Sequence, residues 1–150
     1  MQKKPFKQFI QIPGPNPIIV PGDEGEWDDH LLEACDIFKD GETYYFYYHA
    51  TSKNGRSYEV GVATAPHPMG PWTKPAENPV LTLGAGGAWD DYAVACALIH
   101  KEGLDTYYMY YSGKSKSTGP GDWSVGLAKA PHPLGPWKKI SLDAPLIDGF

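Results

Sequence analysis

Residues Trp27–Tyr48 read WDDHLLEACDIFKDGETYYFYY, and an altered copy, WDDYAVACALIHKEGLDTYYMYY, occupies Trp89–Tyr111. A second matching pair follows: VGVATAPHPMGPW ends at Trp72, and VGLAKAPHPLGPW ends at Trp137. The copies are separated by about 62 to 66 residues. The sequence therefore contains an internal repeat, and a period of this length indicates an architecture assembled from repeated units.

Each copy is predicted to form four short antiparallel strands. In the first copy these are 31–38, 43–50, 58–65 and 71–74, most of them rich in aromatic and β-branched residues and separated by Gly and Pro. No segment shows the period of an amphipathic helix. Four short strands repeated at this spacing are typical of a β-propeller blade, so we predict an all-β propeller.

One domain over 1–150 is expected, with blade repeats at about 16–77 and 78–143 and the start of a third unit at 144–150. Propellers close with about four to eight blades, whereas this sequence supplies two four-stranded blades and a fraction. An open blade leaves a strand edge and a face unpaired. We therefore expect either a piece of a longer protein or a homo-oligomer that completes a ring.

Composition narrows the choice of partners. The 150 residues are 41% hydrophobic and 21% charged and carry a net charge of -5, as in an ordinary globular domain. Basic residues cluster only in the N-terminal MQKKPFK, so neither nucleic acid nor an anionic membrane is an expected partner. No apolar run suits a signal peptide or a spanning helix, which leaves localisation unassigned.

The two copies can be compared with each other to separate structure from function. Residues shared by both copies are expected to hold the blade, and differences on the inner strand mark a candidate site. The differences are Glu33 against Ala95, Asp36 against Leu98, His30 against Tyr92, and His49 against Ser112.

The paired acids Asp28 and Asp29 recur as Asp90 and Asp91. We expect them to turn the chain into the inner strand by accepting backbone N–H bonds. The alternative is that Asp28 or Asp29 faces the channel mouth as a second catalytic carboxylate.

Aromatic side chains both fill β cores and stack on sugars, and this chain has five Trp and ten Tyr. The candidate sugar contacts are Trp27, Trp89, Tyr92, His30 and His49. Trp72 and Trp137, which end the shared turn, are expected to pack between blades instead.

Cys35 and Cys96 lie at nearly corresponding places and lack metal-ligand spacing. We expect buried thiols. A disulfide would require the two copies to lie side by side with Cα atoms within about 7 Å.

Glu33 and Asp36 are three residues apart, so on a regular strand they point to opposite faces unless a bulge intervenes. Glycosidic bond cleavage needs two carboxyl groups about 5 to 9.5 Å apart, one acting as an acid and the other as a base or nucleophile. A propeller channel can gather such groups from different blades.

The run EACDIFKDGETYYFYY, starting at Glu33, resembles the five-bladed propeller glycoside hydrolases of families 43, 32, 68 and 117. Those families carry a Glu-Gly-Pro or Glu-Cys-Pro-Asp signature at the start of an inner strand, before a Tyr-rich second strand. The resemblance implies that Glu33 is the general acid and Asp36 a supporting acid. In an alternative register, matching the family 43 Ala-Pro-Asp-Val run, Asp36 is the pKa modulator. The family-117-like YYHA implies that His49 is an acid or a substrate contact.

Two departures from the family pattern affect the second carboxylate. Cys35 replaces the family proline, and the Asp-Pro of the family's first blade has no clear match. The resemblance therefore leaves Asp28, Asp29, Asp148 or a residue of further blades for this role. It also implies that a calcium ion could occupy the channel, while the sequence itself indicates no metal site.

The sequence thus predicts a glycoside hydrolase acting on a polysaccharide or oligosaccharide through carboxylate acid/base chemistry. Two alternatives remain: a carbohydrate-binding propeller without catalysis, and an inactive blade fragment that self-assembles.

Overall fold

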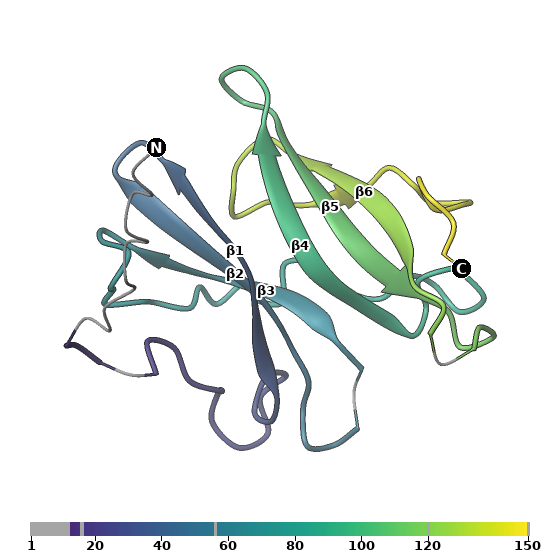
Figure 1. The fold of residues 1–150 in the computed structure, drawn as a ribbon, viewed down its shortest axis with the longest axis horizontal. Coiled ribbons are helices and arrows are strands. Elements are labelled where there is room, and N and C mark those ends of the chain that lie inside the picture. Colours follow the sequence, from purple (N-terminus) through teal and green to yellow (C-terminus); the bar gives the residue numbers. More distant parts are fainter. Residues whose placement is uncertain (1–12, 16, 56, 120, 150) are drawn as a thin grey trace, which may run out of the picture.

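A computed structural model, which describes residues 13–15, 17–55, 57–119 and 121–149, contains two antiparallel sheets. Figure 1 shows the two twisted sheets next to each other. The first has the order β1-β2-β3 and the second the order β4-β5-β6-β7. The strands are β1 (Leu32–Asp40), β2 (Thr43–Ala50), β3 (Glu59–Ala65), β4 (Ala93–Lys101), β5 (Tyr107–Lys114), β6 (Ser124–Ala130) and β7 (Lys138–Lys139).

The all-β prediction is confirmed, and each sheet coincides with one sequence repeat. The fourth strand is weaker than expected. In the first sheet it is a single bridge between Thr64 and Thr73, and in the second it is the two-residue β7. Prolines at positions 71 and 75 flank the bridge and supply no N–H for a longer ladder. Among the described residues there is no helix long and apolar enough to cross a membrane.

The main core lies between the two sheets, where β4 contacts β1, β2 and β3. The core residues are Tyr45, Tyr47, Val60, Val62, Leu81, Val94, Ala97, Met109, Tyr111 and Ala128. The Tyr47 hydroxyl donates to the Pro133 carbonyl at 2.5 Å, and the Trp137 ring meets Tyr47 edge-on at 6.4 Å. The predicted packing between blades is thus confirmed for Trp137. Trp72 instead packs on Phe46 of its own sheet, with ring centroids 5.5 Å apart. It also packs against a second buried cluster of that sheet, formed by Tyr48, Ala50 and Ala63.

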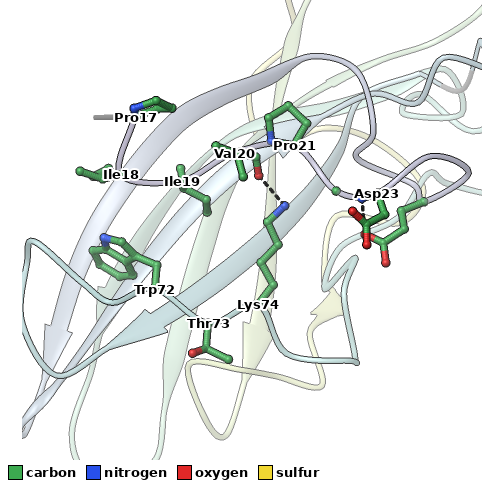
Figure 2. Close-up of a pocket in the computed structure, with 11 residues that line it drawn as sticks. Pro17, Ile18, Ile19, Val20, Pro21, Asp23, Trp72, Thr73 and Lys74 are labelled. Carbon is green, nitrogen blue, oxygen red and sulfur yellow. Dashed lines mark hydrogen bonds between the residues drawn. The ribbon is translucent and has the colours of Figure 1, made fainter. Parts of the chain in front are cut away.

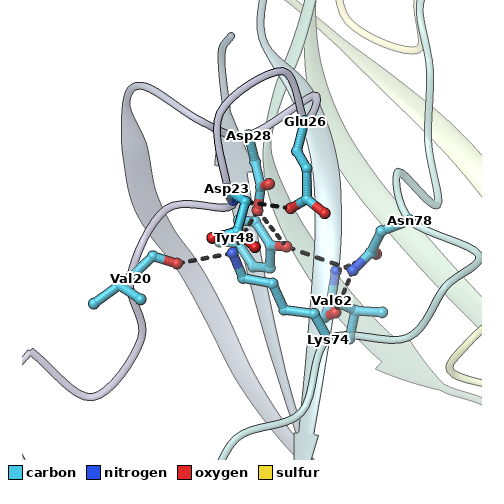
Figure 3. A network of polar contacts seen from close by, with 8 residues as sticks. All are labelled: Val20, Asp23, Glu26, Asp28, Tyr48, Val62, Lys74 and Asn78. Carbon is cyan, nitrogen blue, oxygen red and sulfur yellow. Dashed lines mark hydrogen bonds and ion pairs between the residues drawn. The ribbon is translucent and has the colours of Figure 1, made fainter.

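The same buried ion pair recurs in both sheets. Asp28 accepts from Lys74 at 2.6 Å and from the Tyr48 hydroxyl at 3.1 Å (Figure 3). The second sheet repeats this contact with Asp90, Lys139 at 2.6 Å and the Tyr111 hydroxyl at 3.0 Å. The lysine of the outermost segment therefore ties each blade's outer edge to the turn that leads into its inner strand.

The second acid of each pair shapes a loop. Asp29 accepts backbone N–H bonds from Gly25 at 2.8 Å and Lys53 at 2.7 Å, and these bonds hold the pKa of Asp29 below its usual value. Asp91 accepts from Gly87 and Lys116 in the same way. The expected backbone hydrogen bonds are thus made by Asp29 and Asp91. The expectation is wrong for Asp28 and Asp90, whose carboxylates accept from Lys and Tyr side chains instead.

Candidate active site

A β-bulge brings the two distinctive acids of β1 to one face. Glu33 pairs with His49, and Asp36 pairs with Tyr47, because the register shifts between Ala34 and Asp36. Residues 47 and 49 of β2 share a face, so their partners Glu33 and Asp36 do as well. The opposite orientations of a regular strand are therefore not adopted, since the bulge inserts one extra residue between the acids.

The Glu33 carboxylate is held by two side chains and remains accessible. Its Oε2 lies 3.0 Å from Nε2 of His49, and its Oε1 accepts from the Tyr58 hydroxyl at 3.4 Å. The Glu33 side chain is 57% exposed, whereas that of His49 is 7% exposed. Within this pair, Glu33 is the group that a ligand can reach.

The contacts of His49 determine its tautomer. Its Nδ1 accepts the backbone N–H of Cys96 at 3.3 Å, and a backbone N–H can only donate. The proton of a neutral imidazole must then be on Nε2, which donates it to Glu33. The His49 and Tyr58 rings also meet edge to face, with centroids 4.7 Å apart, which further fixes the imidazole ring.

A hollow of about 260 Å³ opens at this point between the two sheets. It is lined by Glu33, His49, Tyr58, Ala95, Cys96, Ser112 and Trp123. Glu33 and His49 therefore face Ala95 and Ser112, the residues that replace them in the other copy. The internal comparison thus identified both walls of one hollow.

Tyr58 and Trp123 also line this hollow, although inspection of the inner strands alone missed them. Each precedes the third strand of its repeat at the matching position. Extending the comparison of the copies to that position would have found them, because Tyr stands in one copy and Trp in the other.

Asp36 makes a different contact from Glu33. Its Oδ2 accepts the backbone N–H of Ile99 in β4 at 3.0 Å. It therefore fastens the inner strand of one sheet to the inner strand of the other, next to the bulge.

The two cysteines are free, and the expectation of two buried thiols is wrong for Cys96, which is exposed, while Cys35 is half-buried. Both lie where an inner strand bulges, and Cys96 has a φ of 53°. Burial raises the pKa of Cys35 to about 12, so it stays a thiol and can donate to Nδ1 of His49, 3.1 Å away.

The other predicted contacts lie elsewhere. Trp27 stacks on Tyr48 with centroids 5.7 Å apart, and Trp89 stacks on Tyr111 at 5.6 Å. His30 is exposed and donates its backbone N–H to Thr51. Tyr92 is exposed and lines a separate hollow. None of these four residues lines the Glu33 hollow, nor do Asp28 and Asp29, which bind within their own blade.

A further hollow, of about 520 Å³, lies between segment 17–23 and the outer segment 72–74 (Figure 2). Lys74 reaches across it and donates to the Val20 carbonyl at 2.8 Å. Because Lys74 also binds Asp28, this hollow belongs to the structural ion pair, and neither Glu33 nor Asp36 lines it.

Among the described residues, no group of three or more His, Cys, Asp or Glu side chains is arranged to hold a metal ion.

Comparison with known proteins confirms that the chain resembles propeller glycoside hydrolases. A family 117 glycoside hydrolase from the marine bacterium Zobellia galactanivorans is 27% identical over 87% of this chain and 38% of that chain, with a TM-score of 0.72. An exo-β-1,3-galactanase from Phanerochaete chrysosporium is 22% identical, covering 81% of this chain and 29% of that chain, with a TM-score of 0.57. An endo-1,4-β-xylanase from Bacteroides thetaiotaomicron is 23% identical, covering 81% and 43% respectively, with a TM-score of 0.50.

The two sheets are thus propeller blades, and the chain spans less than half the length of each of these three structures. The galactanase and the xylanase, being less than 25% identical, support the fold alone. No protein-family model matches the chain, and no curated protein matches it by sequence.

Proposed function

We propose that the chain forms part of a glycoside hydrolase in which Glu33 protonates the leaving glycosidic oxygen while water attacks the anomeric carbon. One observation carries this assignment: an accessible carboxylate in a hollow, held at both oxygens by side chains of its own blade. The copy in the second blade has Ala95 at this position, as expected if a ring needs its acid on one inner strand only.

The neighbours of Glu33 suit proton donation. Once Glu33 gives its proton to the glycosidic oxygen, it becomes a carboxylate. The N–H of His49 and the O–H of Tyr58 already point at that carboxylate, so its charge is stabilised without rearrangement. His49 is therefore the residue that orients Glu33, and Asp36 supports it by fixing the adjacent bulge against β4.

The partner carboxylate is proposed to come from another blade. Asp28 and Asp29 are engaged within their own blade, and Asp148 does not line the Glu33 hollow. A propeller directs the inner strands of all its blades at one channel, so a residue about 5 to 9.5 Å from Glu33 can belong to a blade distant in sequence.

Substituting Glu33→Gln tests the proposal. We expect the release of sugar from aryl glycosides and polysaccharides to fall by about 10² to 10⁴-fold, because general acid catalysis contributes that much. Glu42→Gln, in the exposed β1–β2 turn, is the control and should keep full activity. Activity that survives Glu33→Gln would contradict the assignment.

A carbohydrate-binding propeller without catalysis is the second candidate, because the aromatic rings of Tyr58 and Trp123 line the hollow. In that case neither the native chain nor the ring it completes hydrolyses any glycoside, and Glu33→Gln weakens sugar binding only modestly.

A further inference from the structure

We infer that a second hollow, next to Trp123, is a subsite for a negatively charged sugar. This deepens the proposed function and rests on it, since the sugar would be part of the same polysaccharide that reaches Glu33. The hollow measures about 400 Å³ and is lined by Tyr92, Lys114, Ser115, Lys116 and Thr118. The anionic group would be a sulfate ester or a uronic acid carboxylate.

The two lysines leave positive charge available in this hollow. The ion pairs of the described residues involve Lys74, Lys101, Lys139 and His49, so neither Lys114 nor Lys116 has a described carboxylate within 4.0 Å of its ammonium group. Two ammonium groups without acidic partners attract an anion and can bind it through charge-assisted hydrogen bonds.

The rest of the lining suits a sugar ring rather than a free ion. The side chain of Tyr92 is 47% exposed, and its backbone N–H donates to the Lys114 carbonyl at 2.9 Å. An exposed ring beside two ammonium groups provides a stacking surface for a sugar face and a contact for its charged substituent. Thr118 lines the same wall, and its hydroxyl donates to the Ser115 carbonyl at 2.9 Å.

Trp123 connects this hollow to the proposed active site. Its ring lines the Glu33 hollow, and the Lys114 ammonium lies over that ring, 5.9 Å from its centroid. Lys114 lines the second hollow and contacts a ring that lines the first, so the two hollows are neighbours and consecutive sugars of one chain can occupy them.

The loop that carries Lys116 is held by hydrogen bonds. Asp91 accepts from the Lys116 backbone N–H at 2.9 Å, the Ser115 hydroxyl at 3.2 Å and the Gly87 N–H at 2.8 Å. The Asp91 carboxylate is thus occupied by the loop itself, and the lysine side chains remain available for a ligand.

Only the second blade has Tyr92, Lys114 and Lys116 together at these positions of the repeat. By alignment of the repeats, His30 and Thr51 stand where the second blade has Tyr92 and Lys114, while Lys53 corresponds to Lys116. Lys53 lines none of the hollows described above, which makes it a matched control for a lysine in the same loop position.

The test is calorimetric titration of the full chain with three tetrasaccharides: a sulfated galactan, the same galactan after desulfation, and a galacturonan. We expect at least one anionic sugar to bind about tenfold more tightly than the neutral one, as one charge-assisted hydrogen bond would give. The double variant Lys114→Gln/Lys116→Gln should lose this preference and keep the neutral affinity, while Lys53→Gln should keep both. Which anionic sugar binds identifies the substituent.

Equal affinity for charged and neutral sugars, no affinity for either anionic sugar, or a preference that survives the double variant would overturn the subsite. Hydrolysis assays with Glu33→Gln separate this result from the proposed function. A lysine-dependent preference without any Glu33-dependent hydrolysis would keep the subsite and refute the catalytic role. Glu33-dependent hydrolysis without a preference for anionic sugars would support the catalytic role and refute the subsite.

Discussion

His49 shows how one buried side chain can orient an exposed carboxylate. It is almost fully buried, receives the Cys96 backbone N–H at one ring nitrogen and donates from the other to Glu33. The orientation of Glu33 therefore depends on a backbone group of the second blade. The contact between the blades thus helps to set the position of the Glu33 carboxylate.

At this scale we predict that His49→Phe lowers hydrolysis by about tenfold, because Glu33 loses one hydrogen bond to an orienting donor. His49→Gln, which can still donate an N–H, should recover part of the loss. The measurement is kcat and its pH profile for both variants on one glycoside. Equal losses in the two variants would show that packing, rather than the donated hydrogen bond, is what His49 provides.

At the scale of elements, the bulge in β1 is the feature that makes the site. It turns Glu33 and Asp36 to one face and frees the Asp36 carboxylate to bind the Ile99 N–H of β4. The second inner strand also bulges, between Ala95 and Leu98, and there its backbone reaches His49. Two bulges at matching places in the repeat thus define one hollow.

A second repeated element is the stack of Trp on Tyr over a glycine. A methyl group on Gly126 would lie 2.5 Å from the rings of Trp89 and Tyr111, and one on Gly61 would lie 2.7 Å from Trp27 and Tyr48. We predict that Gly126→Ala lowers the free energy of unfolding by about 1 to 3 kcal/mol, since overpacking strains a buried stack. Urea denaturation measures the change. Gly86→Ala, where the methyl group meets open space, is the control and should have a much smaller effect.

At the scale of the molecule, the blades are joined at both ends of their inner strands. One junction is the Glu33 hollow, and the other is Asp40, which accepts from the Lys101 ammonium at 2.6 Å and from the Tyr107 hydroxyl. These two donors hold the pKa of Asp40 below its usual value. Large apolar side chains nevertheless remain exposed on and beside the inner strands, including Ile37 at 48% and Leu98 at 56%.

We therefore expect the 16.5 kDa chain to self-associate, because the blades of a propeller cover such faces by packing in a ring. Light scattering after gel filtration should give a mass that is a multiple of the single chain. A single-chain mass over a tenfold range of concentration would contradict this expectation and leave the covering role to other blades.

The sequence alone was sufficient for the all-β class, the two repeats and the choice of Glu33 and His49 as distinctive residues. Local sequence patterns determine these features, since strand period, turn residues and repeat spacing depend on neighbours along the chain. The bulge, the tautomer of His49, the roles of Tyr58 and Trp123 and the exposure of Cys96 required the tertiary structure. Each depends on pairing or contact between residues far apart in the chain, such as Cys96 with His49 and Ile99 with Asp36, which the period of a single strand does not specify.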